Sequence, residues 1–129
     1  MKNPKELKVV MIVEPEVLVR MVVAEYLRDC GYTVIEATAA KDVWTVLGSG
    51  HRLDVVVAEV GAVDGFSLAK GVRQTHPDID VILTSGIAGA AHESHELCKE
   101  GPIKQPYEPK DVEARIRLLL ERRRAASKS

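Results

Sequence analysis

Short apolar runs alternate with amphipathic stretches along the chain. The apolar runs are rich in valine and isoleucine and lie at 8–13, 32–37, 53–58, 80–85 and, more weakly, 102–104. The first, third and fourth runs are almost continuously apolar, which is typical of parallel strands that are covered on both faces. We therefore predict five strands in a parallel sheet.

The stretches between the runs carry apolar residues at helical spacing. The first helix is expected to end at Gly31, and the second is expected to place Trp44 in the core. Asp64 is a candidate N-cap for the third helix, which ends near Pro77. The apolar stripe of the first helix is predicted to be Val19, Val22, Val23, Tyr26, Leu27 and Cys30, and that of the third Leu68, Ala69 and Val72.

The helical pattern is weak in the fourth predicted helix and strong in the fifth. The segment 89–100 has few apolar residues, and although His92 and His95 share a helical face, a solvated helix is favoured there over a metal site. The fifth helix is stronger, with an apolar stripe of Val112, Ile116, Leu119 and Leu120. We expect the residues from Arg122 onward to form a frayed, solvated basic tail.

Strands that alternate with helices predict an α/β fold with a doubly wound parallel sheet. Such sheets bind ligands beyond the carboxyl ends of their strands. Glu14 follows the first strand, Glu59 ends the third, and Thr84 lies at the end of the fourth. These three polar side chains should therefore meet at one edge, where function is expected.

Composition fits one globular domain and narrows the function classes. The 129 residues are 46% apolar and 29% charged, with a net charge of −1 and only 4% aromatic residues. A nucleic-acid-binding domain is usually clearly basic, so neither nucleic acid nor direct DNA binding is expected. No apolar run approaches the roughly 18 residues of a membrane span. Cys30 and Cys98 lie far apart and have no CxxC spacing, so we expect them to be reduced thiols. We expect a cytoplasmic location with no membrane partner.

The loop after the first strand argues against a nucleotide or flavin site. A phosphate cradle needs glycine or hydroxyl residues and free N–H groups at a helix N-terminus. The chain has Glu14, Pro15 and Glu16 there, so two carboxylates repel phosphate and proline lacks a donor. An acidic edge suits instead a cation, or a carboxylate that receives a phosphoryl group.

Four segments in this order resemble the receiver domain of two-component response regulators. They are "VVMIVEPEVLVR", "LDVVVAEV" followed by "DG", "DVILTSG" and "PIKQPYEP", and the resemblance covers about Lys8 to Leu120. It implies a flavodoxin-like receiver fold with strand order 2-1-3-4-5 and five flanking helices. In the family, an aspartate that ends the third strand accepts a phosphoryl group from a histidine kinase, beside a bound Mg²⁺.

The resemblance shows which residue of this chain stands at each functional position of the family. Several of these residues differ from the family pattern. Glu59 stands at the phosphoacceptor position, and Glu14 and Pro15 stand at the two acidic positions. Thr84 and Tyr107 stand at switch positions. The lysine position holds Gln105, followed by the expected Pro106, and any Mg²⁺ would be held weakly by Glu14, Glu59 and Gly61.

The sequence is compatible with three functions. The favoured one is a stand-alone, atypical receiver, not an enzyme, that acts through protein contacts without ordinary aspartyl phosphorylation. The alternatives are a working receiver with Glu59 as acceptor, and an unrelated doubly wound enzyme or small-molecule binder. Expected partners are a histidine kinase or another regulator, and a homodimer is also open. The expected organisation is an extension at 1–7, a receiver-like domain at 8–121 and a tail at 122–129.

Overall fold

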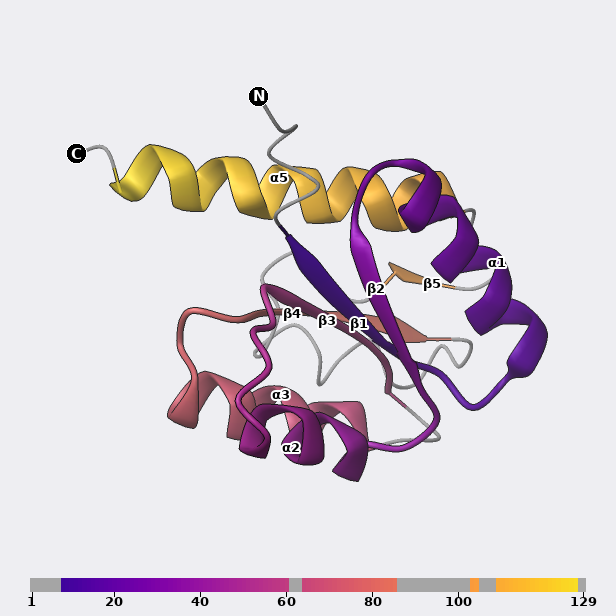
Figure 1. Ribbon diagram of the computed structural model, residues 1–129, viewed down its shortest axis with the longest axis horizontal. Helices are drawn as coiled ribbons and strands as arrows, with labels where there is room; N and C mark the ends of the chain where they lie inside the picture. Colours follow the sequence, from indigo (N-terminus) through magenta and orange to yellow (C-terminus); the bar gives the residue numbers. More distant parts are fainter. Residues whose placement is uncertain (1–7, 61–63, 86–102, 105–108, 128–129) are drawn as a thin grey trace.

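All five predicted strands pair in one parallel sheet (Figure 1). The computed structural model describes residues 8–60, 64–85, 103–104 and 109–127. The strand order is β2-β1-β3-β4-β5, as the resemblance implied. The strands are β1 (Val9–Val13), β2 (Thr33–Ala37), β3 (Val55–Glu59), β4 (Asp80–Ser85) and β5 (Ile103–Lys104).

The described helices cover both faces of the sheet, which makes it doubly wound (Figure 1). Helices α1 and α5 lie over one face, and α2 and α3 lie over the other. Their bounds are Val17–Asp29 for α1, Lys41–Gly48 for α2, Gly65–Thr75 for α3 and Pro109–Ser127 for α5. The helix predicted at 89–100, with His92 and His95, lies outside the described residues.

Side chains of the central strands alternate between two apolar clusters. On β1, Met11 and Val13 join the cluster under α2 and α3, whereas Val10 and Ile12 join the cluster under α1 and α5. All four are at most 2% exposed. A strand buried on both faces needs apolar residues at every position, which explains the nearly unbroken apolar runs.

The buried face of α1 differs from the predicted stripe. Val23, Ala24 and Leu27 are buried as a helix face should be, but Val22 is 54% exposed and Tyr26 is 37% exposed. The prediction for Val22 and Tyr26 was wrong. Nearly every residue in the first two turns of α1 is apolar, so several faces satisfy the helical spacing and the pattern alone does not choose one.

Two predictions on the opposite face also need correction. Trp44 is 39% exposed rather than part of the core. Its indole covers Gly71 of α3 so closely that a Cβ there would lie 3.0 Å from the ring. Asp64 holds the N-cap position of α3, as predicted, but it has a left-handed φ of 54° and its side chain makes no capping hydrogen bond.

Helix α5 continues through the arginines that were expected to form a frayed tail. Val112 and Ile116 are buried, as predicted. The helix then runs on to Ser127, and Arg123 forms an ion pair with Asp80 at the start of β4. Arg123 also donates from Nη2 to the carbonyl of Pro77, at 3.0 Å. The expectation of a frayed tail was therefore wrong for this segment, whereas Arg122 and Arg124 are exposed to solvent as expected.

Candidate functional site

The three polar residues predicted to meet do lie at the carboxyl edge of the sheet. Glu59 ends β3 and is directly paired in register with Thr84 of β4. Val13, the last residue of β1, pairs with Ala58, so Glu14 follows at the same level. Glu14 and Thr84 are buried, at 4% and 2% exposed, whereas Glu59 is half-buried. Sheet register thus accounts for the grouping.

The loop between β1 and α1 holds the carboxylate of Glu14 in place. The backbone N–H of Glu14 donates to the carbonyl of Ala37 at 3.0 Å. Pro15 has no N–H to donate, and the next N–H, that of Glu16, donates to Glu14 Oε2 at 2.9 Å. The side chain of Glu14 therefore closes a tight local turn, and Pro15 lies exposed at its apex.

The second oxygen of Glu14 has no hydrogen-bond partner among the described residues. Oε1 is buried, and Glu14 borders a gap that is too narrow for a water molecule. Arg20 and Thr84 also line this gap. A buried carboxylate oxygen that lacks a partner costs folding free energy, and no hydrogen bond from the described residues offsets that cost at Oε1.

Burial raises the pKa of the Glu14 carboxyl above its ordinary value, and this is the largest influence on it. The hydrogen bond from the Glu16 N–H lowers the pKa, whereas the carboxylates of Glu59 and Glu16 raise it further. The guanidinium of Arg20 lowers it by a smaller amount. Two carboxylates that face one edge repel each other, so the site favours a neutral or cation-paired Glu14.

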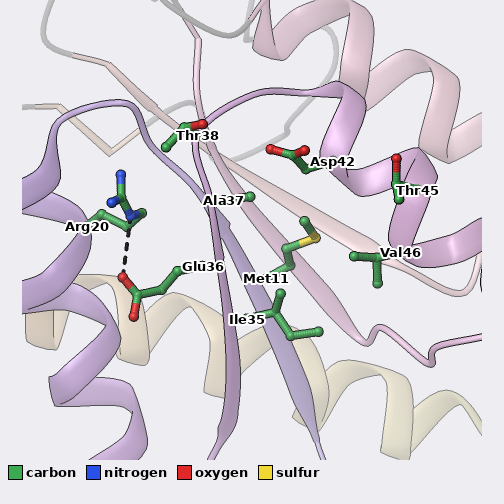
Figure 2. Close-up of a pocket in the computed structure, with 9 residues that line it drawn as sticks. All are labelled: Met11, Arg20, Ile35, Glu36, Ala37, Thr38, Asp42, Thr45 and Val46. Carbon is green, nitrogen blue, oxygen red and sulfur yellow. Dashed lines mark hydrogen bonds and ion pairs between the residues drawn. The ribbon is translucent and has the colours of Figure 1, made fainter.

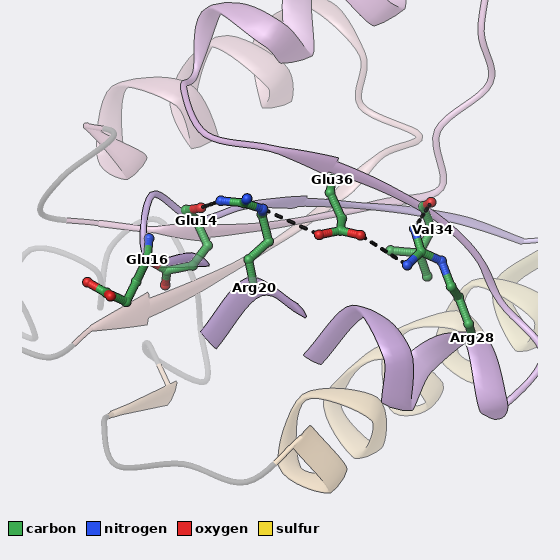
Figure 3. Close-up of polar contacts among 6 residues, drawn as sticks. All are labelled: Glu14, Glu16, Arg20, Arg28, Val34 and Glu36. Carbon is green, nitrogen blue, oxygen red and sulfur yellow. Dashed lines mark hydrogen bonds and ion pairs between the residues drawn. The ribbon is translucent and has the colours of Figure 1, made fainter. Parts of the chain in front are cut away.

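Arg20 is a site residue that the sequence interpretation missed (Figure 3). Its Nη1 donates to the backbone carbonyl of Glu14 at 2.8 Å, and its Nε lies 3.4 Å from Glu36 Oε1. Arg28 reaches the other oxygen of Glu36 at 3.0 Å, so Glu36 bridges two arginines of α1. The signal in the sequence was a lone cation among the apolar residues that begin α1.

Gly65 shapes the other side of the edge, where α3 approaches the end of β3. A Cβ on Gly65 would lie 2.9 Å from the Cα of Val60 and 3.2 Å from the carbonyl oxygen of Glu59. The backbone N–H of Val60 donates to the carbonyl of Thr84 at 2.9 Å. Only glycine fits this approach without a shift, which gives the "DG" of the sequence a packing reason.

A separate open hollow of about 410 Å³ lies beside the edge strand β2 (Figure 2). Its lining includes Arg20, Glu36 and Asp42 with apolar residues such as Met11. Asp42 already accepts a hydrogen bond from the N–H of Ala39 at 3.2 Å. The described lining of the hollow contains none of the predicted site residues, and its charged groups of both signs do not define a ligand class.

The described residues do not fit a tightly held Mg²⁺. Mg²⁺ requires near-ideal octahedral oxygen coordination. Pro15 supplies no side-chain oxygen, and Glu14 Oε2 is already engaged by the N–H of Glu16. Within the described ranges, no group of three or more His, Cys, Asp or Glu residues could hold a metal ion. Gly61, Gln105, Pro106 and Tyr107 lie outside those ranges.

Comparison with known proteins decides the family. The family model of the response regulator receiver domain matches residues 10–117. The chain belongs to the receiver domain family. Its members are signalling modules of two-component systems, and they interact with histidine kinases and other signalling proteins. The match covers β2 to β5, all of β1 except Val9, and about the first half of α5.

Curated relatives of this receiver are parts of larger proteins. It is 33% identical over 118 residues to the sensor kinase CckA of Brucella abortus, covering 88% of this chain and 12% of that protein. It is 28% identical over 118 residues to the probable transcriptional regulator ycf27 of Cyanophora paradoxa, covering 89% of this chain and 49% of that protein. The receiver therefore spans half or less of the length of these relatives.

Solved structures support the fold. A receiver domain protein of Methanospirillum hungatei matches with a TM-score of 0.82 at 19% identity, covering 93% of this chain and 98% of that one. The chemotaxis regulator CheY4 of Vibrio cholerae matches with a TM-score of 0.71 at 20% identity, covering 84% and 98% of the respective chains. None of the helices in the described part of this receiver has both the length and the apolar character of a membrane span.

Proposed function

We propose that this receiver works in two-component signalling through protein contacts, without ordinary aspartyl phosphorylation. The observation that carries the proposal is the pair of residues at the carboxyl edge, Glu59 at the acceptor position and Pro15 beside Glu14. We further propose that it is not an enzyme and acts in the cytoplasm. Its partners are signalling proteins, with a histidine kinase or another regulator as the expected class.

The chemistry of phosphoryl transfer supports this proposal. Catalysis of that reaction consists mostly of positioning and of electrostatic stabilisation of the phosphoryl oxygens. Glutamate places its carboxylate one methylene further from the strand than aspartate, and a misplacement of about 1 Å can cost roughly 10²-fold in rate. Pro15 removes a metal ligand and Gln105 removes a positive charge, so the three changes reinforce one another.

Glu59 also offers a way to signal without a phosphoryl group. Its carboxylate is half-buried and lies in register with Thr84, at the switch position of the family. A fixed negative charge at this place acts on the same edge as an acquired phosphoryl charge would. We propose that Glu59 holds the receiver near one signalling state by its charge.

The test uses the amide resonance of Thr84 in labelled protein. The proposal predicts that a small phosphodonor with Mg²⁺ leaves this resonance unchanged, because no phosphoryl group is added. Glu59→Gln keeps the size of the side chain and removes its charge, so it should shift the resonance. Glu25→Gln removes an exposed charge on α1 and serves as the matched control, with no shift expected.

A second candidate function is a receiver that accepts phosphate on Glu59. The observation in its favour is that Glu59 is half-buried, whereas Glu14 and Thr84 at the same edge are buried. Under this candidate, phosphodonor shifts the Thr84 resonance in the unaltered protein and has no effect on Glu59→Gln. That pattern would replace the first proposal with the second.

A further inference from the structure

The outer side of β2 carries main-chain groups that no other described strand uses. β2 stands first in the strand order, so among the described strands only β1 pairs with it. The carbonyl of Ala37 accepts the N–H of Glu14 at 3.0 Å, so the main chain of Ala37 faces the β1 side. Because main-chain groups alternate in direction along a strand, those of Val34 and Glu36 point away from β1. The main-chain groups of these two residues are here called the β2 edge.

Most of the β2 edge has no hydrogen-bond partner within the described part of the chain. This holds for the N–H of Val34 and for both main-chain groups of Glu36. The exception is the carbonyl of Val34, which accepts a hydrogen bond from Nη2 of Arg28 at 3.0 Å (Figure 3). A row of unpaired main-chain groups is a template on which another extended chain can pair.

The open hollow of about 410 Å³ lies beside the β2 edge and wraps around the strand. Arg20 and Glu36 line it on the side of α1, whereas Ile35 and Val46 line it on the side of α2 (Figure 2). The hollow alone defines no ligand class. A strand added to the sheet places alternate side chains on its two faces, and a pocket beside the edge then selects among those side chains.

Charge on the α1 side of the β2 edge favours an acidic segment. Arg20 and Arg28 share the single carboxylate of Glu36, at 3.4 Å and 3.0 Å, which leaves one positive charge in excess. The side chain of Arg28 is 44% exposed. A carboxylate on an incoming strand would pair with Arg28 and draw it from the carbonyl of Val34. That carbonyl could then accept an N–H of the new strand.

We infer that the β2 edge binds an extended segment of a partner protein as an additional strand of the sheet. The segment carries an acidic side chain toward Arg28 and an apolar side chain into the α2 side of the hollow. Main-chain hydrogen bonds provide the affinity in this mode of recognition, and the side chains provide the specificity. Arg28 covers the edge while it is empty, as charged side chains do on many edge strands.

A second copy of this receiver fits the β2 edge less well than an acidic segment. In a twofold antiparallel pairing, Val34 would lie opposite Glu36 of the twin. The junction would then gather two copies of Arg20 and two of Arg28 around only two carboxylates, and like charges brought together are destabilising. Residues 1–7 of the same chain contain two lysines and one glutamate, so they would also add positive charge.

This inference goes beyond the proposed function, because strand addition at β2 uses neither the phosphoacceptor position nor a metal. Arg20 is common to both places, since its Nη1 donates to the Glu14 carbonyl at 2.8 Å and its side chain also lines the hollow. An occupied hollow would therefore lie one side chain away from the acidic edge. Binding at the β2 edge needs no charge on Glu59, so the two claims are tested separately.

The test uses four synthetic seven-residue peptides and labelled protein. One alternates apolar residues with glutamate, and the second has lysine in place of glutamate. The other two are the glutamate peptide with N-methyl groups on alternate main-chain nitrogens, one in each of the two possible phases. The glutamate peptide should produce saturable shifts of the β2 amides, and the lysine peptide should bind about tenfold more weakly. Only one of the methylated peptides should lose binding, because only alternate nitrogens face β2.

Hydrogen exchange locates the contact at single amides. In the free protein, the amides of Val34 and Glu36 should exchange faster than that of Ile35, which faces β1. The glutamate peptide should slow exchange at Val34 and Glu36 at least about tenfold and leave Ile35 unchanged.

Variants separate the main-chain contact from the charge. Glu36→Pro and Glu36→Ala both remove the carboxylate, but only proline removes the outward N–H, so Glu36→Pro should bind the glutamate peptide at least about tenfold more weakly than Glu36→Ala. Arg28→Gln should abolish the preference for glutamate over lysine. Arg73→Gln, at an exposed position on α3, is the control and should keep that preference. Circular dichroism verifies that each variant keeps its fold.

Several results would overturn the inference. Equal binding of the two methylated peptides, absence of binding by the glutamate peptide, or protection that maps outside β2 would remove it. A dimer in light scattering that persists in Glu36→Ala and is lost in Glu36→Pro would assign the edge to a second copy. Slow exchange at Val34 and Glu36 in the free protein that is lost when residues 1–7 are removed would assign it to that segment. Glu59→Gln should bind the glutamate peptide normally, which distinguishes a failure at the β2 edge from a failure of the role proposed for the Glu59 charge.

Discussion

At the residue scale, Glu14 has the least favourable environment in the part of the chain that the structure describes. One of its oxygens accepts the N–H of Glu16, and the other is buried without a partner among the described residues. The carboxylate of Glu59 lies near enough to raise the pKa of Glu14 further. Features that cost stability tend to be kept where they serve function, which is consistent with a site at this edge.

The first prediction concerns Glu14→Gln. The amide keeps an acceptor for the Glu16 N–H, and it removes the buried charge and its repulsion with Glu59. We expect the free energy of unfolding near neutral pH to rise by about 1 kcal/mol, because an unpartnered buried charge is lost. Urea denaturation measures the change, and Glu25→Gln, an exposed site on α1, should leave it within about 0.5 kcal/mol.

The stability difference between Glu14→Gln and the unaltered protein should depend on pH, because the pKa of Glu14 is raised. The pKa of Glu14 is raised above its ordinary value of 4.5, so between the two values the folded state holds more protons than the unfolded state. Stability therefore falls as pH rises through that window. The advantage of Glu14→Gln should disappear below the ordinary pKa, at about pH 4. A variant that is less stable near neutral pH would show that the carboxylate is needed for the fold.

At the element scale, α1 and α2 show how much of a helix the spacing of apolar residues predicts. The existence of both helices and the end of α1 near Gly31 were predicted, but the orientation of α1 was only partly right. Because Val17, Leu18, Val19, Met21, Val22 and Val23 are all apolar, only the packed structure shows which of them face the sheet. In the short α2, Val43 is fully buried and Trp44 lies at the rim, because so short a helix buries little of its surface.

The second prediction belongs to the element scale and concerns the end of α5. Arg123 Nη2 lies 3.0 Å from Asp80 Oδ1, and it also donates to the Pro77 carbonyl. These contacts hold the last turns of α5 against the start of β4. Arg123→Gln should lower the free energy of unfolding by about 1 kcal/mol, an upper value for a pair that is partly exposed to solvent.

Hydrogen exchange separates a local effect from a global one in this variant. The amides after Ile116 should exchange faster in Arg123→Gln, because the end of α5 opens without the rest of the fold. Glu121→Gln is the control, since Glu121 is an exposed charged residue in the same part of α5. Equal exchange in the two variants would mean that the contact with Asp80 does not hold the helix end.

At the scale of the whole molecule, the sheet and its edge were predictable because alternation and parallel pairing allow few arrangements. Glu14, Glu59 and Thr84 were found from their positions at strand ends, and register brings them together. Arg20 was not found, because its role depends on how α1 turns over β2 and the apolar pattern does not define that rotation. The roles of Gly61, Gln105, Pro106 and Tyr107 stay predictions.

The central claim is that three positions together, rather than Glu59 alone, keep this receiver from ordinary phosphorylation. The most direct measurement is intact mass after incubation with a small phosphodonor and Mg²⁺. The unaltered protein and Glu59→Asp should gain no phosphoryl group, because Pro15 and Gln105 still leave metal and phosphoryl oxygens unsupported. Glu59→Asp combined with Pro15→Asp and Gln105→Lys should gain one. A phosphoryl group on the unaltered protein that is lost in Glu59→Gln would contradict the account.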